Sequence, residues 1–388
     1  MLTVRPGNTH ETGDGLRLPA DAERALSRLT FPATGKIAIA VSGGGDSMAL
    51  LAMLAARHDL LDTNRLLAIT IDHGLRVESA DEAAEVARWC AGRGIAHATR
   101  RWADPVTGPG VQAAARLARY RLLSQAALDA GAIAVLTAHT RDDQRETVAM
   151  RQLRGEGRGL SGIAPATLFM ESGLWFCRPF LGVARDSLRQ WLAGAGISWV
   201  DDPSNDNARF ERVRLRRALN GVRLEDAADL DVAASTFAAE RVAMARQVAD
   251  WLDRHVTSTD ARAFMIDRAA FGTMPEVELL ALRILLAHAG RRDHLPGEGQ
   301  VAGRLGPLAA LAPLRFTLGG AVVSARRGSV SIKPEGPRRG VDRPSGERQQ
   351  DGLHPWASLL PIHDIEAVRA LSRLAGLAEP ESPPVGGI

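Results

Sequence analysis

Cysteine is nearly absent from this 388-residue sequence, which contains only Cys90 and Cys177. The two lie far apart along the chain and form no CxxC pair, so the sequence offers neither a disulfide framework nor four thiolate ligands for a metal. The same scarcity argues against enzymes that handle sulfur or an iron–sulfur cluster through paired cysteines.

Long hydrophobic runs are also missing. No stretch approaches the roughly 18 consecutive apolar residues that a membrane-spanning helix needs. The first twenty residues have no apolar segment typical of a secretion signal, and they include acidic residues, which transit peptides avoid. We therefore expect no membrane segment and a cytoplasmic location, and the length allows two or three domains.

Lysine is the third scarcity. Lys36 and Lys333 are the only lysines, and the other 46 of the 48 basic residues are arginine, for a net charge of +3. A GC-rich genome produces the same arginine and alanine bias, so composition alone favours a polyanionic partner only mildly.

Apolar runs alternate with helical patterns through the first part of the chain. Short, continuous runs bounded by turn residues predict buried parallel strands at 37–41, 66–71 and 132–138. Helical patterns cover 46–57, 78–93, 111–131 and 142–154. This alternation predicts an α/β fold with a doubly wound, mostly parallel sheet, in which ligands bind beyond the carboxyl ends of the strands.

The later part of the chain has a different character. Residues 222–292 have a largely helical pattern, and residues 315–335 alternate like a hairpin with glycine turns. We therefore predict a smaller helical or α+β region after the α/β domain. The predicted divisions are a flexible N-terminal tail at 1–32, the α/β domain at 33–219, the C-terminal region at 220–375 and a disordered tail at 376–388.

A glycine-rich loop, SGGGDS, joins the first predicted strand to the first helix. It is neither a Walker A loop nor a GxGxxG dinucleotide motif. Its backbone N–H groups, serine hydroxyls and following helix N-terminus would suit phosphate, but Asp46 would repel phosphate unless it caps the helix or holds Mg²⁺. Alone, the loop is equally compatible with a plain strand-to-helix turn. Its residues are Ser42, Gly43, Gly44, Gly45, Asp46 and Ser47.

Two further segments bring polar residues near the predicted strand ends. Asp72 and His73 follow the second strand, where a nucleotide would lie, although a solvated turn is the simpler interpretation. Arg116 and Arg119 are three residues apart and share one helix face. Such a pair suits phosphate binding or a solvated, salt-bridged surface.

Carboxylates and arginines mark the last two segments of interest. Asp143 and Glu146 share a helix face just after the third strand, which suits an ammonium group or Mg²⁺, or merely complements the helix dipole. Farther along, an Asp-Pro turn leads to a strongly positive helix that favours phosphate contacts. Its arginines are Arg209, Arg212, Arg214, Arg216 and Arg217.

The SGGGDS loop resembles the motif of the PP-loop ATP pyrophosphatases. Together with DHGLR, QAAARLARYR, TAHTRDDQRET and its glycine-rich continuation, and DDPSND with the arginine helix, it resembles the tRNA(Ile)-lysidine synthetase family from about Lys36 to Leu219. The resemblance implies a PP-loop ATP pyrophosphatase domain at 33–219 and a tRNA-recognition role for 220–375.

The resemblance also implies a reaction. ATP would adenylate C2 of the wobble cytidine in a tRNA(Ile) with a CAU anticodon, and free L-lysine would then displace AMP to form lysidine. Ser42 to Ser47 would hold the ATP phosphates, with Asp46 near Mg²⁺ and with Asp72 and His73 beside the nucleotide. The remaining residues carried over are Arg116 for phosphates or adenylate, Asp143 and Glu146 for the lysine amine, and Arg212 and Arg214 near the reaction centre.

Two positions depart from the family pattern: Thr140 stands where relatives carry a second histidine, and Val213 where they carry asparagine. The rival hypotheses are a PP-loop tRNA cytidine thiolase, disfavoured by the missing CxxC pair, and an ammonia-dependent synthetase. A non-catalytic nucleic-acid-binding protein would explain the arginine helix but not the glycine loop with its aspartate. A homodimer is compatible with the sequence.

Overall fold

The computed structural model describes residues 17–72, 79–102, 111–155, 158–201, 224–310, 312–336 and 354–387. The chain forms two compact units: unit 1 is Met1–Ala238 with Ser382–Ile388, and unit 2 is Ala239–Glu381. The division between these compact units does not fall after residue 219, where the sequence predicts the end of the α/β domain. It falls instead within α8 (Leu224–His255), an uninterrupted helix without the turn-rich composition from which a boundary is recognised.

Unit 1 contains a doubly wound α/β sheet. Its strands lie in the order β5-β6-β4-β1-β2-β3. The pairings of β1 with β2 and β4, of β2 with β3 and of β4 with β6 are parallel, whereas β5 runs antiparallel to β6. The fold class predicted from the sequence is confirmed. The strands are β1 (Lys36–Ala40), β2 (Leu66–Asp72), β3 (Ala96–Arg101), β4 (Ala132–Leu136), β5 (Ala166–Phe169) and β6 (Leu174–Cys177).

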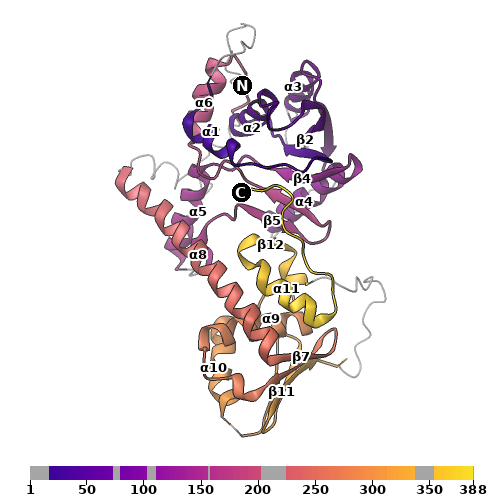
Figure 1. Cartoon of the computed structure of the whole chain (residues 1–388), viewed down its shortest axis with the longest axis vertical. Helices are drawn as coiled ribbons and strands as arrows, with labels where there is room; N and C mark the ends of the chain where they lie inside the picture. Colours follow the sequence, from indigo (N-terminus) through magenta and orange to yellow (C-terminus); the bar gives the residue numbers. More distant parts are fainter. Residues whose placement is uncertain are drawn as a thin grey trace. The chain divides into compact units, whose positions relative to one another are not determined.

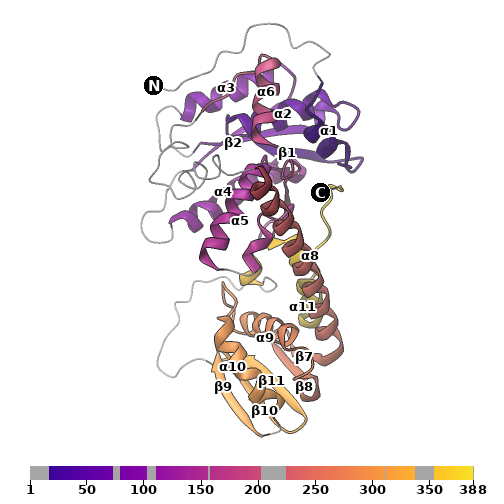
Figure 2. The same ribbon diagram turned by 90° about the vertical axis from the view of Figure 1, so that its left-hand side faces the viewer.

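Helices cover both faces of this sheet. Figure 2 shows α2, α3 and α6 on one face and α4 and α5 on the other. Since the chain moves outward from β1 through β2 on one side and reaches β4 on the other, the topological switch point lies between β1 and β4. The helices are α1 (Ala20–Ser27), α2 (Gly45–Ala56), α3 (Ser79–Ala91), α4 (Val111–Asp129), α5 (Arg141–Arg154) and α6 (Arg185–Gly194), with 3-10 turns at Thr63–Arg65 and Arg158–Ser161.

The core of unit 1 explains why its strands are continuous apolar runs rather than alternating ones. In β1, the successive residues Ile37, Ala38 and Ile39 are all fully buried. Because helices cover both faces of the sheet, side chains on either face are removed from water. Leu50 and Leu51 of α2 are fully buried as well, so the helix after the glycine loop is held rigidly against the sheet.

Both predicted tails are wrong where the structure describes them. Residues 20–27 form α1, which buries Ala22 and Leu26 completely. Near the other end, Thr30 and Gly386 exchange backbone hydrogen bonds of 3.2 and 3.0 Å, and Val385 is fully buried. The proline- and glycine-rich composition predicted disorder, but paired backbone groups and a buried valine order this segment within unit 1.

Unit 2 is an α+β unit, as predicted, with an antiparallel sheet in the order β7-β8-β11-β10-β9. The hairpin expected at 315–335 is extended to three strands. The prediction of a largely helical segment at 222–292 is wrong at 256–267, where β7 and β8 form a strand pair. In β8, the alternate residues Phe264 and Ile266 point into the core. Helix α9 packs against β10 and β11 (Figure 1).

The elements of unit 2, besides its part of α8, are the following. The strands are β7 (Val256–Asp260), β8 (Ala263–Asp267), β9 (Leu314–Leu318), β10 (Ala321–Ala325), β11 (Ser329–Pro334) and β12 (Leu359–Pro361). The helices are α9 (Pro275–Ala289), α10 (Glu298–Ala309) and α11 (Ile365–Ala375), with 3-10 turns at Arg268–Ala270, Pro355–Ala357 and Ile362–Asp364.

A chain of hydrogen bonds runs through two buried histidines of unit 2. His288 donates Nε2–H to the carbonyl oxygen of Ala261 at 2.9 Å, which leaves its Nδ1 to accept from Nδ1–H of His354 at 2.8 Å. The remaining nitrogen of His354 accepts from the hydroxyl of Ser372 at 3.0 Å. Neutral rings satisfy every hydrogen bond of this chain, and burial lowers the pKa of His288 and lowers that of His354 to about 3.

We expect unit 2 to lose stability as the pH falls below about 6.5 towards 3. In this pH range the histidines are protonated in the unfolded chain but remain neutral in the folded unit. The free energy of unfolding therefore falls by up to about 1.4 kcal/mol per pH unit for each group. The nearby Arg262 and Arg291 oppose protonation of His288 further. Urea denaturation between pH 7 and 5 measures the slope. His354→Gln should flatten it and exposed His58→Gln should not; an unchanged slope in His354→Gln would contradict this account.

Candidate functional site

The glycine loop between β1 and α2 requires glycine at one of its three positions and leaves little room for a side chain at another. Gly43 has a φ of +81°, a backbone conformation that is strained for any residue with a Cβ atom. A Cβ on Gly45 would lie 3.3 Å from the ring of Trp199, closer than normal packing allows. The loop is therefore a built structure with a bare backbone, rather than a flexible connection.

The two serines of the loop bind each other across the turn. The backbone N–H of Ser42 donates to Oγ of Ser47 at 3.2 Å, and the Ser47 hydroxyl donates to the Gly44 carbonyl at 2.9 Å. Gly44 is the N-cap of α2, and no side-chain cap bond is made there. The N–H groups of the first turn of α2 therefore suit an anion.

Asp46 is not the helix cap that the simpler interpretation of the loop required. It lies in the first turn of α2, and its Oδ2 accepts from Nε of Arg185 at 3.1 Å. Its Oδ1 is buried without a hydrogen-bond partner among the residues that the structure describes. Burial raises the pKa of this carboxyl, an effect that Arg185 opposes. A buried oxygen of this kind fits a cation ligand.

Arg185 brings together the three carboxylates predicted from the sequence. Besides Asp46, its guanidinium contacts Oδ1 of Asp143 at 2.9 Å and Oε1 of Glu146 at 3.5 Å. Its backbone N–H donates to Oδ2 of Asp142 at 2.8 Å. Burial disfavours the charged guanidinium, but the surrounding carboxylates outweigh this and raise the pKa of Arg185. Asp46, Asp143, Glu146 and Arg185 are called the carboxylate cluster below.

Arg185 is not among the site residues predicted from the sequence, although its position carries a signal. Arg185 is the first residue of α6, where the helix dipole disfavours a cation. A basic residue in that position needs nearby carboxylates to offset the dipole, and the cluster supplies them. The cluster lies beside the switch point, because Asp46 follows β1 and the other two acids follow β4.

Thr140, the departure from the family pattern, has a defined task here. It is fully buried and forms a capping box with Asp143: Oδ2 of Asp143 accepts from the Thr140 backbone N–H at 2.8 Å and from its hydroxyl at 2.9 Å. Asp143 thus has one oxygen that caps α5 and one that contacts Arg185. The threonine orients an acidic residue of the cluster.

Thr140→Val should lower the free energy of unfolding by about 1 kcal/mol, because the side chain keeps its volume and loses the cap. Urea denaturation measures the difference. Thr140→Ser keeps the hydroxyl and should stay close to wild type. An unchanged Thr140→Val beside a destabilised Thr140→Ser would show that the methyl group, not the capping hydrogen bond, stabilises this turn.

Arg116 lies apart from these contacts. Its Nη2 donates to the hydroxyl of Tyr120 at 3.1 Å, and its guanidinium lies 5.2 Å from the centre of that ring. The same hydroxyl accepts at 3.0 Å from Arg178, a buried arginine whose pKa is lowered by burial. Arg119 is close enough for its charge and that of Arg116 to repel. These arginines form a local positive region on α4 and directly after the end of β6.

Of the four remaining site residues predicted from the sequence, the structure describes one and leaves three outside the described residues. Asp72 ends β2, as expected, and its Oδ1 accepts from the Ser79 hydroxyl at 2.5 Å. His73, Arg212 and Arg214 lie outside the described residues, as do the remaining arginines of the predicted positive helix.

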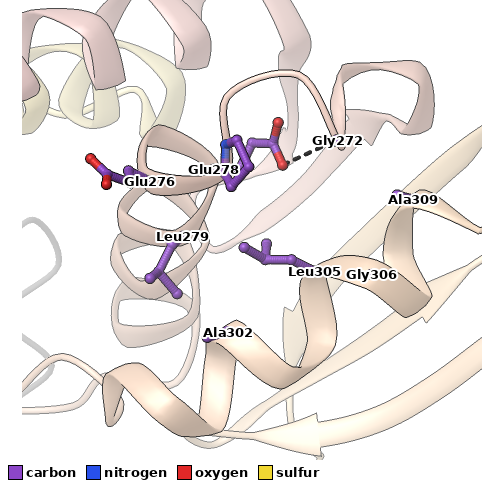
Figure 3. Close-up of a pocket in the computed structure, with 9 residues that line it drawn as sticks. Gly272, Glu276, Glu278, Leu279, Ala302, Leu305, Gly306 and Ala309 are labelled. Atoms are coloured by element: carbon purple, nitrogen blue, oxygen red, sulfur yellow. Dashed lines mark hydrogen bonds between the residues drawn. The ribbon is translucent and has the colours of Figure 1, made fainter.

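Unit 2 has a pocket of about 430 Å³ between α9 and α10, but it is mostly apolar and contains none of the predicted residues (Figure 3). Its buried Glu278 accepts backbone hydrogen bonds of 2.7–2.9 Å from Gly272, Thr273 and Met274, and so caps α9. The hydrogen bonds of this carboxylate therefore serve the local fold. The carboxylate cluster of unit 1 is the better candidate site.

The two cysteines are buried and free. Burial raises the pKa of the Cys90 thiol to about 11 and that of Cys177 to about 12. Neither is therefore a reactive thiolate at neutral pH. Among the described residues no group of three or more His, Cys, Asp or Glu side chains could hold a metal, and no described helix is long and apolar enough to cross a membrane.

The loop, the parallel sheet and the carboxylates at its switch point define a PP-loop protein, and the PP-loop domain profile matches residues 19–222. A tRNA(Ile)-lysidine synthase from Mesorhizobium japonicum is 40% identical over 82% of this chain and 70% of its own length. Those from Bradyrhizobium sp. and Methylobacterium nodulans are 38% and 40% identical, over 86% and 83% of this chain and 99% and 98% of theirs. The chain belongs to the tRNA(Ile)-lysidine synthase family, which confirms the family predicted from its motifs.

Proposed function

We propose that the chain is an ATP-dependent ligase that attaches free L-lysine to C2 of the wobble cytidine in tRNA(Ile) with a CAU anticodon. The product, lysidine, pairs with A, so the tRNA reads AUA instead of AUG. The observation that carries the proposal is the carboxylate cluster, which joins the glycine loop to two acids suited to an amine. Family membership favours this ligase over the thiolase, the ammonia-dependent synthetase and the non-catalytic protein.

In the first step, the C2 carbonyl oxygen attacks the α-phosphorus of ATP and pyrophosphate leaves. The bare backbone from Gly43 to Gly45 and the hydroxyls of Ser42 and Ser47 bind the phosphates. Asp72 and His73 are proposed to bind beside the nucleotide, and Arg116 is proposed to approach the phosphates or the adenylate. The positive charge of Arg116 stabilises the negative charge that develops as pyrophosphate departs.

Mg²⁺ fits the residues present, because Asp46 has a buried carboxylate oxygen without a described partner. One carboxylate together with substrate phosphates is a common way for proteins to bind this ion. When bound, Mg²⁺ would neutralise phosphate charge. Asp46 itself stays oriented through its other oxygen, which accepts from Arg185 at 3.1 Å.

In the second step, the amine of lysine attacks C2 and loses a proton, the C2–O bond breaks, and AMP leaves. Asp143 and Glu146 accept hydrogen bonds from the ammonium group and orient the amine. Glu146 is only 1% exposed, so its charge acts in a poorly screened environment. Arg212 and Arg214 are proposed to approach this reaction centre, and the target base must leave its stack to reach it.

The RNA needs further contacts, and unit 2 is proposed to supply some of them. Exposed arginines on the surface of unit 2 suit phosphate contacts: Arg291, Arg292, Arg304, Arg315, Arg326 and Arg327. We propose the cytoplasm as the place of the reaction, where ATP, lysine and tRNA meet. A homodimer remains a prediction, which light scattering during gel filtration would test.

Radiolabelled lysine decides the proposal. With ATP and an unmodified tRNA(Ile) transcript bearing a CAU anticodon, label should enter the RNA, and it should not when ATP is omitted or when the wobble cytidine is replaced by uridine. Absence of label, with transfer of ammonia or sulfur instead, would refute the proposed function.

A further inference from the structure

We propose that Arg185 is a positioning residue that holds the carboxylate of the ATP half-site and those of the lysine half-site in one arrangement. This inference rests on the proposed function. Arg185 contacts Asp46 on α2 and both Asp143 and Glu146 on α5, while belonging to α6 itself. A single side chain thus joins three helices at the switch point of the sheet.

The guanidinium divides its donors between the two half-sites. Nε donates to Asp46 at 3.1 Å, Nη2 donates to Asp143 at 2.9 Å, and Nη1 lies 3.5 Å from Glu146. The planar fork fixes the directions of these nitrogens relative to one another, so the position of one carboxylate constrains the other two. A lysine in this position could not do so, because its ammonium group is a single point of charge.

The backbone of Arg185 is held as firmly as its side chain. Its N–H donates to Oδ2 of Asp142 at 2.8 Å, and Arg141 N–H donates to the carbonyl of Val183 at 2.9 Å. The start of α6 is thereby bonded to the start of α5. The side chain of Arg185 is only 13% exposed, so the guanidinium is a fixed part of the site rather than a mobile surface group.

Charge explains why such a residue is needed. Three carboxylates this close would repel one another, and each would favour protonation or outward rotation. One guanidinium offsets a single charge, so the four ionised groups of the cluster keep a net charge of −2. The cluster therefore stays attractive to the ammonium group of lysine and to a cation beside the phosphates, and the guanidinium keeps its acids aligned.

Arg185→Gln should impair both half-reactions. We expect adenylation of the tRNA, measured without lysine as pyrophosphate release, to slow by about 10-fold or more, because a small misplacement of a reacting group is costly. The KM for lysine should rise by about 10-fold or more, while the KM for ATP changes less, since the glycine backbone still binds the phosphates. Arg185→Lys should recover part of the first step and little of the lysine KM.

Controls separate positioning from folding. Arg121→Gln removes an exposed arginine of α4 that pairs with Glu171 at 2.9 Å, and it should leave both half-reactions unchanged. Should Arg185→Gln fold poorly, the double variant Arg185→Gln with Glu146→Gln removes one buried acid and should recover thermal stability. Its adenylation rate should stay low, whereas Glu146→Gln alone should adenylate within about threefold of the wild-type rate; equal adenylation rates in the two variants would refute the positioning role.

The outcomes distinguish this inference from the proposed function. A wild-type protein that incorporates no lysine refutes the function itself. A wild-type protein that incorporates lysine, beside an Arg185→Gln variant with an unchanged lysine KM and an unchanged adenylation rate, refutes the positioning role. Loss of thermal stability with unchanged kinetics at permissive temperature also refutes it, because it assigns Arg185 to the fold alone.

Discussion

Asp46→Asn should abolish ATP-dependent AMP release, lowering its rate by at least about 1000-fold. Asparagine keeps the shape of the side chain but removes its negative charge, and with it the carboxylate that fits a cation beside the phosphates. The helix should persist, because Asp46 does not cap α2 and Gly44 makes no side-chain cap bond there. Pyrophosphate and AMP release, measured with ATP, lysine and the tRNA transcript, give the rates of the two half-reactions.

The matched control for this variant is Asp59→Asn. Asp59 is an exposed carboxylate of unit 1 that pairs with Arg57 at 2.7 Å, so its removal changes the net charge equally without touching the glycine loop. We expect wild-type kinetics. If Asp46→Asn released AMP at the wild-type rate, the interpretation of Asp46 as a charged member of the phosphate site would be wrong.

The glycine loop illustrates what local sequence can predict. Its glycines, serines and aspartate follow from the motif alone, and the strand before it and the helix after it follow from apolar patterning. Whether Asp46 was a cap or a ligand could not be read from six residues. That choice depends on Arg185, which is 139 residues away in the chain and reaches Asp46 only in the folded sheet.

Other differences between prediction and structure have the same origin. The strand pair β7 and β8 lies in a stretch that reads as helical, and its pairing depends on contacts with β11. The segment around Val385 has the composition of a disordered tail, yet it pairs with Thr30 near the opposite end of the chain. Long-range partners, which local composition does not contain, decide both cases.

Thr140 departs from the family pattern and has a structural role at the start of α5. The motif suggests a lost histidine, but the structure assigns the position to the cap of α5, where threonine is among the preferred residues. Its backbone and hydroxyl hold Oδ2 of Asp143, leaving Oδ1 directed to Arg185. In this chain the threonine therefore orients one of the acids on which binding of lysine is proposed to depend.

Glu146→Gln should separate the two half-reactions. The adenylated tRNA should form within about threefold of the wild-type rate, whereas the KM for lysine should rise about 10- to 100-fold, the cost of a lost charge-assisted hydrogen bond. Glutamine keeps the volume of the buried side chain, and Arg185 retains its closer contacts with Asp46 and Asp143. Adenylated tRNA should therefore accumulate at low lysine concentration.

Single-turnover assays with labelled ATP and then labelled lysine measure these steps separately. Glu85→Gln, an exposed acid of α3 that lies 3.8 Å from Arg88, serves as the control and should behave as wild type. If Glu146→Gln lost adenylation while keeping the wild-type lysine KM, Glu146 would belong to the ATP half-site. The division of labour within the cluster would then be the reverse of the one proposed, with the acids on α5 serving the nucleotide and the amine bound elsewhere.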